Sequence, residues 1–389
     1  MMNKAVLGML LTASVVSVAE AQTKMVEKVT KNADELVIPY TKYKLPNGLT
    51  LIVHEDHSDP VVHVDVTYHV GSAREEVGKS GFAHFFEHMM FQGSDNVADE
   101  EHFKIVSESG GTLNGTTNRD RTNYFETVPS NQLETALWLE ADRMGFLLDA
   151  VTQPKFEVQR ETVKNERGQN YDNRPYGLVY EMTSKNLYPY GHPYSWTTIG
   201  YIEDLNRVNV NDLKNFFLRW YGPNNATLTV GGDVKPEEVV KLVEKYFGSI
   251  PAGPAVQNMK PMVAQLDKDR YVSYEDNIRF PMLRMTFPTP EAGHKDEPAL
   301  DVLAEVLGQG KNSIFYKNFV KGQKAMQASV GNSTSELSGE FGVTVVAYPN
   351  TPLAQTEELA RQSIAEFEQR GISDEDLQRR HIYVEASRG

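Results

Sequence analysis

The stretch GFAHFFEHMMFQGS, residues 81–94, constrains this chain most, because it places titratable side chains inside an otherwise apolar run. At 100° per residue, a helix puts His84, Glu87 and His88 on about 100° of arc and the large apolar side chains opposite. The segment is therefore predicted to be a helix that ends near Gly93, with its apolar face in a hydrophobic core. The three polar residues would share its other face.

Two histidines four residues apart on a helix can bind the same metal ion, because their side chains lie over the same surface. Zinc accepts imidazole and carboxylate ligands at about 2.0–2.2 Å. A solvated polar face would look the same by angle alone, but such faces usually carry Lys, Arg, Gln or Ser. His84 and His88 are therefore predicted to bind one zinc ion per chain, with a solvated face as the alternative.

A catalytic zinc normally has three protein ligands and one open position, so a third donor is needed. The later segment EVQRETVKNERGQNYDN, residues 157–173, is predicted to be helical. Gln159, Glu166 and Asn170 lie along one stripe of this helix, whereas Glu161 points about 140° away from Glu166. Glu166 is therefore the better candidate ligand. An ordinary surface glutamate in a helix rich in Arg and Lys is the alternative.

The remaining patterns predict an α+β protein. VVHVDVTYHV, residues 61–70, alternates between apolar and polar side chains, as a half-buried strand does. Two short strands are predicted around the turn Pro46-Asn47-Gly48. Further helices are predicted at 99–109, 130–148, 154–171 and 236–247, and further strands at 112–117, 123–128 and 224–233.

Length and composition predict two domains. At 389 residues the chain exceeds one ordinary hydrophobic core. Residues 22–38 are polar and unpatterned and are predicted to be a linker, and the Pro- and Gly-rich text PAGPAVQNMKP predicts a second linker at 251–268. The N-terminal domain would then cover residues 39–250, and the second domain residues 269–389.

The second domain reads as a weaker copy of the first. EPALDVLAEVLGQGKNS, like the segment that begins at Gly81, has an apolar helical pattern that ends in Gln-Gly. When the two segments are aligned, Asp301, Ala304 and Glu305 occupy the positions of the His-x-x-Glu-His residues of the first copy. A duplication would therefore leave the second copy without the metal-binding pattern.

The end of the chain predicts an unfinished helix. SDEDLQRRHIYVEASRG opens with a capping box formed by Ser373 and Asp376 and continues to Gly389 without a cap or a closing strand. The second domain is therefore expected to be incomplete, and the chain to be a fragment of a longer protein.

The first 21 residues have the layout of a secretory signal peptide, with Lys4, an apolar run from Ala5 to Val18 and small residues at 19 and 21. Cleavage is expected after Ala21, with a buried N-terminal helix as the alternative. The apolar run is short for a bilayer and no later stretch qualifies, so no membrane span is predicted. The expected location is the periplasm or the medium outside the cell.

Charge and cysteine content narrow the possible partners. The formal charge of −14 argues against a general nucleic-acid partner, because nucleic-acid binding needs a basic face. The chain has no cysteine, so it can form neither a disulfide framework nor a lipid-acceptor Cys.

His-x-x-Glu-His, the inverse of His-Glu-x-x-His, marks the inverzincin metallopeptidases. Four wider stretches resemble the pitrilysin and mitochondrial-processing-peptidase family, M16. They are VGSAREEVGKSGFAHFFEHMMFQGS, GGTLNGTTNRDRTNYFETVP, VQRETVKNERGQ and YGPNNATLTVGGD. The resemblance is close over about residues 40–250 and looser over 270–389. It implies two duplicated domains, each a mixed sheet packed against several helices, that form half of a clam-shaped chamber.

The resemblance also implies roles for single residues. In that family two histidines and a glutamate on a later helix bind zinc, and the glutamate between the histidines is the general base. Carried over, His84, His88 and Glu166 are the zinc ligands and Glu87 is the base. Many relatives have an acidic residue seven positions before the third ligand, where this chain has Gln159. Gln159 would support the ligands through a hydrogen bond without adding charge.

The strand TLNGTT matches an exposed edge strand to which, in relatives, the substrate backbone adds as a further strand. Asn114 and Gly115 occupy the matching positions, and glycine would allow close backbone approach; a plain turn residue is the alternative. Relatives also close the site with an Arg and a Tyr from a second, catalytically silent half. That half is not found in this sequence, so missing chain or a partner subunit is expected to supply it.

The sequence therefore predicts an exported zinc endopeptidase that hydrolyses peptides or unfolded polypeptides. One alternative is a non-catalytic partner subunit of a heteromeric peptidase of the same family, although such subunits generally lose the motif. The other is a structural zinc module, which would need four filled ligand positions where only three donors are predicted.

Overall fold

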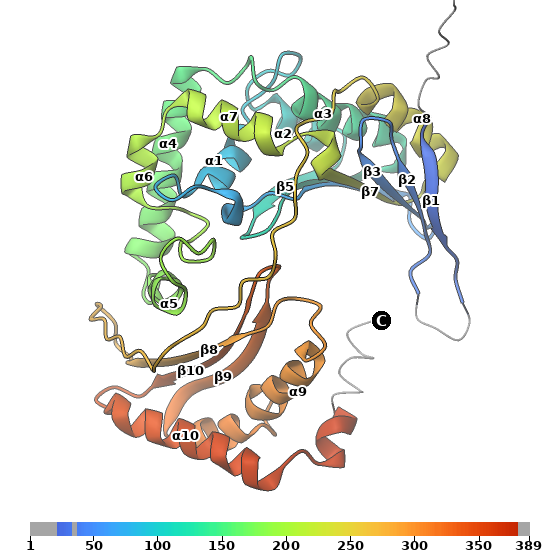
Figure 1. The fold of residues 1–389 in the computed structure, drawn as a ribbon. Helices are drawn as coiled ribbons and strands as arrows, with labels where there is room; N and C mark the ends of the chain where they lie inside the picture. Colours follow the sequence, from blue (N-terminus) through green and yellow to red (C-terminus); the bar gives the residue numbers. More distant parts are fainter. Residues whose placement is uncertain (1–21, 33–36, 380–389) are drawn as a thin grey trace, which may run out of the picture.

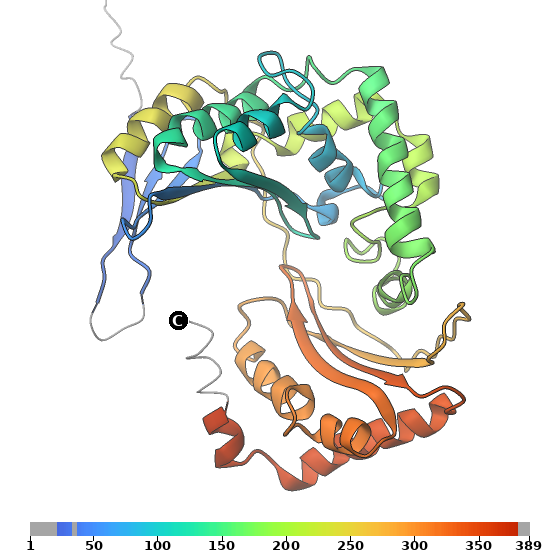
Figure 2. The same ribbon diagram turned by 180° about the vertical axis from the view of Figure 1, so that it is seen from behind.

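The computed structural model describes residues 22–32 and 37–379. The expected signal peptide, residues 1–21, lies outside this range. The described residues form a seven-stranded sheet in the order β1-β2-β3-β7-β4-β6-β5 and a three-stranded sheet in the order β8-β10-β9. Helices cover the outer face of each sheet, and the uncovered faces turn toward each other (Figures 1 and 2).

The first sheet is mixed. Strands β3 (Thr50–Glu55) and β7 (Ala226–Gly232) run parallel, and all its other neighbours are antiparallel. Strand β4 (Val61–Tyr68) keeps the predicted alternation, since Val62, Val64, Val66 and Tyr68 are buried and the residues between them are not. The other strands are β1 (Lys24–Val29), β2 (Tyr40–Lys44), β5 (Thr112–Thr117) and β6 (Thr122–Pro129).

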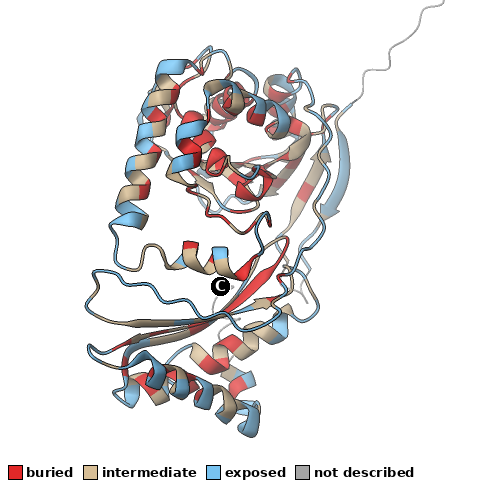
Figure 3. Ribbon diagram, turned by 60° about the vertical axis from the view of Figure 1, so that its left-hand side comes forward, coloured by how far each residue is buried: buried red, intermediate tan, exposed pale blue. Residues whose placement is uncertain are grey.

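Eight α-helices accompany this sheet in the described part of the chain. Buried residues concentrate where the helices and the sheet face each other (Figure 3). The helices are α1 (Phe82–Met89), α2 (Glu101–Glu108), α3 (Leu133–Gly145), α4 (Gln153–Arg167), α5 (Val179–Leu187), α6 (Ile202–Arg207), α7 (Val210–Trp220) and α8 (Pro236–Phe247).

The second sheet repeats part of the first. Its antiparallel order β8-β10-β9 has the same connectivity as β4-β6-β5, and α9 follows β8 as α1 follows β4. Asp301 on α9 accepts a hydrogen bond from Asn332 on β9 at 2.9 Å, so the helix contacts its edge strand there. The elements are β8 (Met282–Thr289), α9 (Glu297–Gly308), β9 (Ala325–Thr334), β10 (Gly339–Ala347) and α10 (Leu353–Arg370).

The two sheets meet along a polar seam at the hairpin between β5 and β6. Arg119 in this hairpin forms an ion pair with Glu340 of β10 at 2.9 Å, and both side chains are buried. Its neighbour Asp120 accepts a hydrogen bond from the backbone N–H of Glu336 at 3.0 Å. His69, just after β4, contacts the Glu336 carboxylate at 2.5 Å. The second sheet is therefore fastened to the part of the first sheet that carries β5.

The predicted α+β class, with mixed sheet and packed helices, is confirmed. Residues 251–281 contain neither helix nor strand, while the division into domains at 251–268 stays a prediction. The expected linker 22–38 differs from the structure, because Lys24–Val29 pairs with β2 as edge strand β1. Its side chains are nearly all exposed, so no apolar face marks it in the sequence. Within the described residues, no helix is both long and apolar enough to cross a membrane.

Candidate metal centre

Helix α1 begins at a glycine that a buried glutamate holds in place. Gly81 has φ +93°, a conformation that side-chain-bearing residues rarely adopt, and a Cβ there would lie 2.9 Å from the carbonyl oxygen of Ile199. The Glu75 carboxylate accepts hydrogen bonds from the backbone N–H of Gly81 at 3.0 Å and of Ala83 at 2.8 Å. Carboxyl oxygens at this end of a helix satisfy N–H groups that have no partner within the helix. Burial raises the pKa of Glu75 to about 8.

The apolar face of α1 fixes its orientation. Phe85 packs against Phe156 of α4 and Phe86 stacks on Phe217 of α7, each with ring centroids 5.0 Å apart. These side chains are fully buried or nearly so, whereas the three polar residues of the motif are half-buried. The helix therefore turns the motif away from the core and toward α4 and β5.

The structure brings His84, His88 and Glu166 together. Their candidate ligand atoms all lie within 4.8 Å of one another. The Glu166 carboxylate oxygen Oε2 is 3.6 Å from Nε2 of His84 and 3.3 Å from Nε2 of His88. Ligands at about 2.1 Å from a tetrahedral zinc ion are about 3.4 Å apart. The donor set and its spacing therefore fit a zinc ion.

The protonation states of these donors also suit a cation. Burial and the neighbouring His88 lower the pKa of His84 to about 4, so its imidazole is neutral at pH 7. Hydrogen bonds, chiefly from His88 and also from Asn170, lower the pKa of Glu166 and keep it ionised. A neutral imidazole and a carboxylate are the forms that bind metals.

Glu87 lies beside this donor set and is held by β5. The Thr117 hydroxyl donates a hydrogen bond to Oε2 of Glu87 at 2.5 Å. Burial raises the pKa of Glu87, while the Thr117 hydrogen bond and His88 lower it. Oε1 is left without a hydrogen-bond donor among the described residues, so this oxygen is free to take up a proton.

Strand β5 is an edge strand, as expected for TLNGTT. The Asn114 side chain is exposed. Gly115 is buried on the other face of the strand, where a Cβ would lie 3.2 Å from Cγ of Glu87 and 3.1 Å from the Phe91 ring. The absent side chain therefore makes room for the helix that carries Glu87, a reason for glycine that the sequence does not reveal.

Gln159 lies on the stripe of α4 that contains Glu166, and its side chain is buried. Among the described residues, no hydrogen bond joins Gln159 to either histidine or to Glu166. Its supporting role therefore stays a prediction.

A second group of donors, His102, Glu126 and Glu140, also lies within ligand distance and is buried. The Arg143 guanidinium contacts His102 Nδ1 at 3.1 Å and Glu140 Oε1 at 3.1 Å. The positive charge of Arg143 inside this buried group disfavours a second cation there. Among the described residues, no arginine or lysine forms an ion pair with Glu166, so the group formed by His84, His88 and Glu166 is the candidate metal centre.

Comparisons with known proteins identify the family of this chain. The family described as insulinase (peptidase family M16) matches residues 50–191, and the peptidase M16 inactive domain matches residues 207–380. The chain is 33% identical over 328 residues to the zinc protease PqqE of Helicobacter pylori. The aligned residues make up 83% of this chain and 73% of that protein. This chain belongs to peptidase family M16. The resemblance read from the motifs is thereby confirmed.

Other relatives of this M16 chain are more distant. The beta subunit of the Saccharomyces cerevisiae mitochondrial-processing peptidase is 28% identical over 218 residues, which are 55% of this chain and 46% of that subunit. A protease from Helicobacter pylori superposes with a TM-score of 0.84 at 30% identity, over 90% of this chain and 85% of that one. Pitrilysin shares the fold, with a TM-score of 0.73 at 18% identity, over 92% of this chain and 39% of pitrilysin.

The sequence did not single out two residues that the structure places at this M16 site. Thr117 ends the strand TLNGTT, and only the pairing of β5 beside α1 shows that it reaches Glu87. Glu75 lies seven positions before the first residue of α1, and the intervening loop brings it back to the helix N-terminus. An acidic residue shortly before a predicted helix is a weak signal that would have pointed to Glu75.

Proposed function

We propose that this chain is a zinc-dependent endopeptidase that hydrolyses peptides or unfolded polypeptides. His84, His88 and Glu166 would hold one zinc ion, and Glu87 would act as the general base. The observation that supports the proposal most is the spacing of the three donors. Oε2 of Glu166 lies 3.3 Å from Nε2 of His88 and 3.6 Å from Nε2 of His84, and Glu87 lies beside this group without belonging to it. The zinc protease relative adds support from family membership.

The number of donors favours a catalytic over a structural zinc site. Among the described residues, the donor group contains three members and no fourth. Structural zinc sites normally fill four positions with protein ligands, whereas catalytic sites keep one open.

The chemistry divides between the ion and the chain. When bound, zinc would lower the pKa of a coordinated water and polarise the scissile carbonyl. Glu87 would take up a proton at Oε1 and pass it to the departing amine, while Thr117 fixes the other carboxylate oxygen. Burial raises the pKa of Glu87, which favours the uptake of a proton by this carboxylate.

The substrate would bind as an extended strand along β5. This strand lies at the edge of the first sheet, directly beside α1. Asn114 is exposed there. Backbone pairing at an edge tolerates many side chains, which suits a peptidase that acts on unfolded chains.

We further propose export and a closing partner. The signal-peptide layout of residues 1–21 supports a location in the periplasm or outside the cell. A second half or a partner subunit would close the chamber and supply the Arg and Tyr that relatives use. The match to 39% of pitrilysin and to a protein named as a subunit supports this expectation.

The proposal is tested by separating metal binding from hydrolysis. Glu87→Gln is expected to keep one zinc per chain and to lose at least about 10³-fold in kcat, because it removes the base but no ligand. Glu166→Gln is expected to lower zinc content and activity together. Zinc is measured by atomic absorption and cleavage with a quenched peptide.

Glu161→Gln is the matched control for Glu166, because Glu161 lies on the same helix, is exposed and pairs with Lys164 at 2.8 Å. Its zinc content and kcat should equal those of the wild type. Full hydrolysis by Glu87→Gln, or hydrolysis that survives removal of zinc by a chelator, would contradict the proposal.

A further inference from the structure

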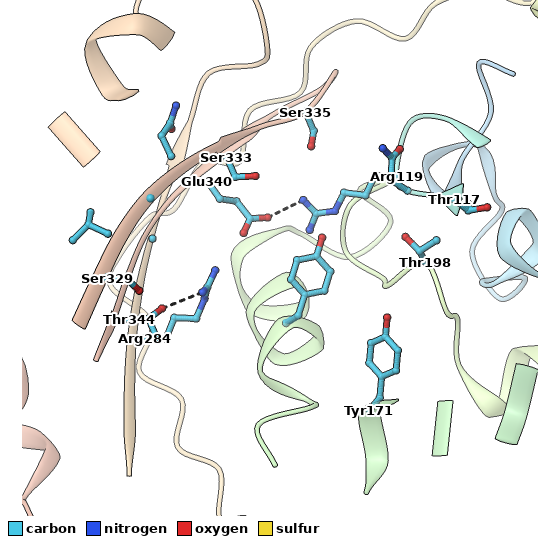
Figure 4. Close-up of a pocket in the computed structure, with 16 residues that line it drawn as sticks. Thr117, Arg119, Tyr171, Thr198, Arg284, Ser329, Ser333, Ser335, Glu340 and Thr344 are labelled. Carbon is cyan, nitrogen blue, oxygen red and sulfur yellow. Dashed lines mark hydrogen bonds and ion pairs between the residues drawn. The ribbon is translucent and has the colours of Figure 1, made fainter. Parts of the chain in front are cut away.

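A cavity of about 600 Å³ lies between the two sheets, next to the candidate metal centre. Its walls come from the hairpin after β5, from the turns that follow α4, from α5 and from the uncovered face of the second sheet (Figure 4). Thr117 belongs to this wall, and its hydroxyl is the donor to Glu87. A group inside the cavity therefore lies beside the atoms that would carry out hydrolysis.

Two glycines leave the middle of the cavity floor without side chains. Gly331 of β9 and Gly342 of β10 are cross-strand partners. A Cβ at Gly331 would meet no atom within 4 Å, so the space above it is open. Hydroxyl groups flank this gap on neighbouring positions of the same sheet face, namely Ser329, Ser333 and Thr344. The floor is polar and open, as a site for a polar group would be.

Three charged residues line the cavity, and two of them neutralise each other. Arg119 and Glu340 form the buried ion pair of the seam. Arg119 is held further by the Tyr194 ring, whose centroid is 4.7 Å from the guanidinium carbon. This pair is therefore part of the scaffold and offers little net charge to a ligand.

The third charged residue, Arg284 of β8, has no carboxylate partner. Its Nη1 donates to the Thr344 hydroxyl at 3.3 Å, and among the described residues it forms no ion pair. The guanidinium lies over the glycine floor, since a Cβ at Gly342 would be 3.5 Å from its Nη2. Figure 4 shows Arg284 and Glu340 on the same side of the second sheet, with Arg119 and Tyr171 across from them.

Resting on the proposed peptidase function, we propose that this cavity is a specificity subsite in which Arg284 binds a carboxylate of the substrate. The carboxylate belongs either to an Asp or Glu side chain or to the C-terminus of the peptide. A guanidinium donates two parallel hydrogen bonds to a carboxylate, a geometry that a neutral amide cannot match. The hydroxyls of Ser329 and Thr344 lie on the same floor and would satisfy its remaining lone pairs.

The subsite predicts a preference that depends on position in the peptide. A set of quenched peptides carries one Glu, moved stepwise along an otherwise neutral sequence, and each is paired with its Gln counterpart. A second set compares a free C-terminus with an amidated one. At one position the wild type should favour the carboxylate by about 2- to 5-fold in kcat/KM, mainly through KM, as an ion pair to the exposed Arg284 provides.

Variants of Arg284 assign that preference to the guanidinium. Arg284→Gln should bring the ratio between the Glu and Gln peptides close to one. Arg284→Lys should keep part of it, and Arg284→Glu should reverse it toward a Lys-bearing peptide. Arg279→Gln is the matched control, because Arg279 is an exposed arginine of the same segment that packs on Phe280 and does not line the cavity. It should leave the ratio unchanged.

Binding without hydrolysis keeps this inference separate from the proposed function. The same peptides, labelled for fluorescence anisotropy, are titrated into Glu87→Gln with and without Arg284→Gln. Carboxylate-dependent binding that Arg284→Gln removes supports the subsite even if no peptide is cleaved. A wild type without any carboxylate preference, or a preference that Arg284→Gln leaves intact, overturns it.

Discussion

One hydroxyl and one missing methyl group determine where the Glu87 carboxylate lies. Thr117 donates to Oε2, and Gly115, two residues earlier on the same strand, leaves the space that Cγ of Glu87 occupies. The two positions share one face of the strand, and the half-buried Thr116 between them lies on the other face. In the proposed function, strand β5 would therefore serve two roles, since it would offer its edge to the substrate while Thr117 holds the proposed base.

The space at Gly115 yields a test of this arrangement. Gly115→Ala introduces a Cβ at 3.2 Å from Cγ of Glu87 and from the Tyr124 ring, closer than ordinary contact. Glu87 must then move by a few tenths of an ångström. We expect kcat to fall about tenfold while KM and zinc content stay near wild type, as measured by steady-state kinetics and metal analysis.

Gly231→Ala is the control, because Gly231 also lies in a strand of the first sheet and its added Cβ would be 3.9 Å from His54, an ordinary contact. It should leave kcat unchanged. If Gly115→Ala instead raises KM and spares kcat, the glycine acts on the substrate path and not on Glu87.

At the level of elements, α1 is short, and its ends depend on partners outside the helix. It has eight residues, and Glu75 satisfies two of its first N–H groups. The same carboxylate accepts a hydrogen bond from Trp196 Nε1 at 3.1 Å. All three partners donate, so an amide in place of the carboxylate would turn its NH₂ toward at least one donor.

Glu75→Gln is therefore expected to destabilise the chain and to loosen the metal centre. A buried donor left without an acceptor costs about 1–3 kcal/mol. Burial raises the pKa of Glu75 to about 8, so the loss comes from the hydrogen bonds and not from a lost charge. We expect a loss of about 2 kcal/mol in the free energy of unfolding, measured in urea, and about tenfold weaker zinc binding, measured by competition with a chelator.

The neighbouring Glu76→Gln provides the comparison, because Glu76 is exposed and contacts Lys79 at 3.2 Å. Its stability and zinc affinity should match the wild type. An equal loss in both variants would show that charge in this loop, and not the hydrogen bonds to α1, is responsible.

Local patterns allowed much of the site to be predicted, and long-range contacts account for the rest. His84 and His88 are four residues apart, so they share a face of any α-helix that contains them, and the helical period alone predicts that they lie together. Glu166 lies nearly eighty residues later, and it joins them only because Phe85 and Phe156 pack α1 against α4. In the sequence alone, Glu166 is one of several acidic residues in a polar segment that is predicted to be helical.

Other features leave no local pattern at all. Strand β1 has no buried face and exists through its pairing with β2, so the alternation that reveals β4 is absent. Arg284 faces the cavity because β8 lies beside β10 in the second sheet, and a single arginine in a strand carries no signal of this. Both depend on pairing between segments that are separate in the sequence.

On the scale of the whole molecule, the two sheets are joined by few but well-placed polar contacts. Glu336, at the turn between β9 and β10, contacts His69 at 2.5 Å and Arg74 at 3.8 Å. The hydrogen bond from His69 lowers the pKa of Glu336, with a smaller contribution from Arg74. The ionised carboxylate is thus the form that fastens the second sheet to the first.

This shift predicts how stability depends on pH. A carboxyl group whose pKa is lower in the folded than in the unfolded state stabilises above about pH 4.5 and loses that effect as pH falls through the folded value. Glu336→Gln should therefore be about 1 kcal/mol less stable than the wild type at pH 7, a value reduced for partial exposure. The difference should shrink as pH falls below about 4.5 and through the lowered pKa of Glu336. Urea unfolding in the presence of a chelator measures both.

Glu368→Gln, at an exposed position of α10, should show no difference at either pH. A Glu336→Gln deficit that stays constant from pH 7 to pH 3 would mean that packing at the turn matters and the charge does not.

Thr117 lies in the cavity wall and also holds Glu87, and this shared position has a pharmacological consequence. In the proposed function, a ligand that binds only the metal ion would use none of the side chains of this wall. A small acid anchored at Arg284 and extended to compete for the Thr117 hydroxyl would instead misalign the base without touching the ion. Selectivity would then come from a wall built by both sheets.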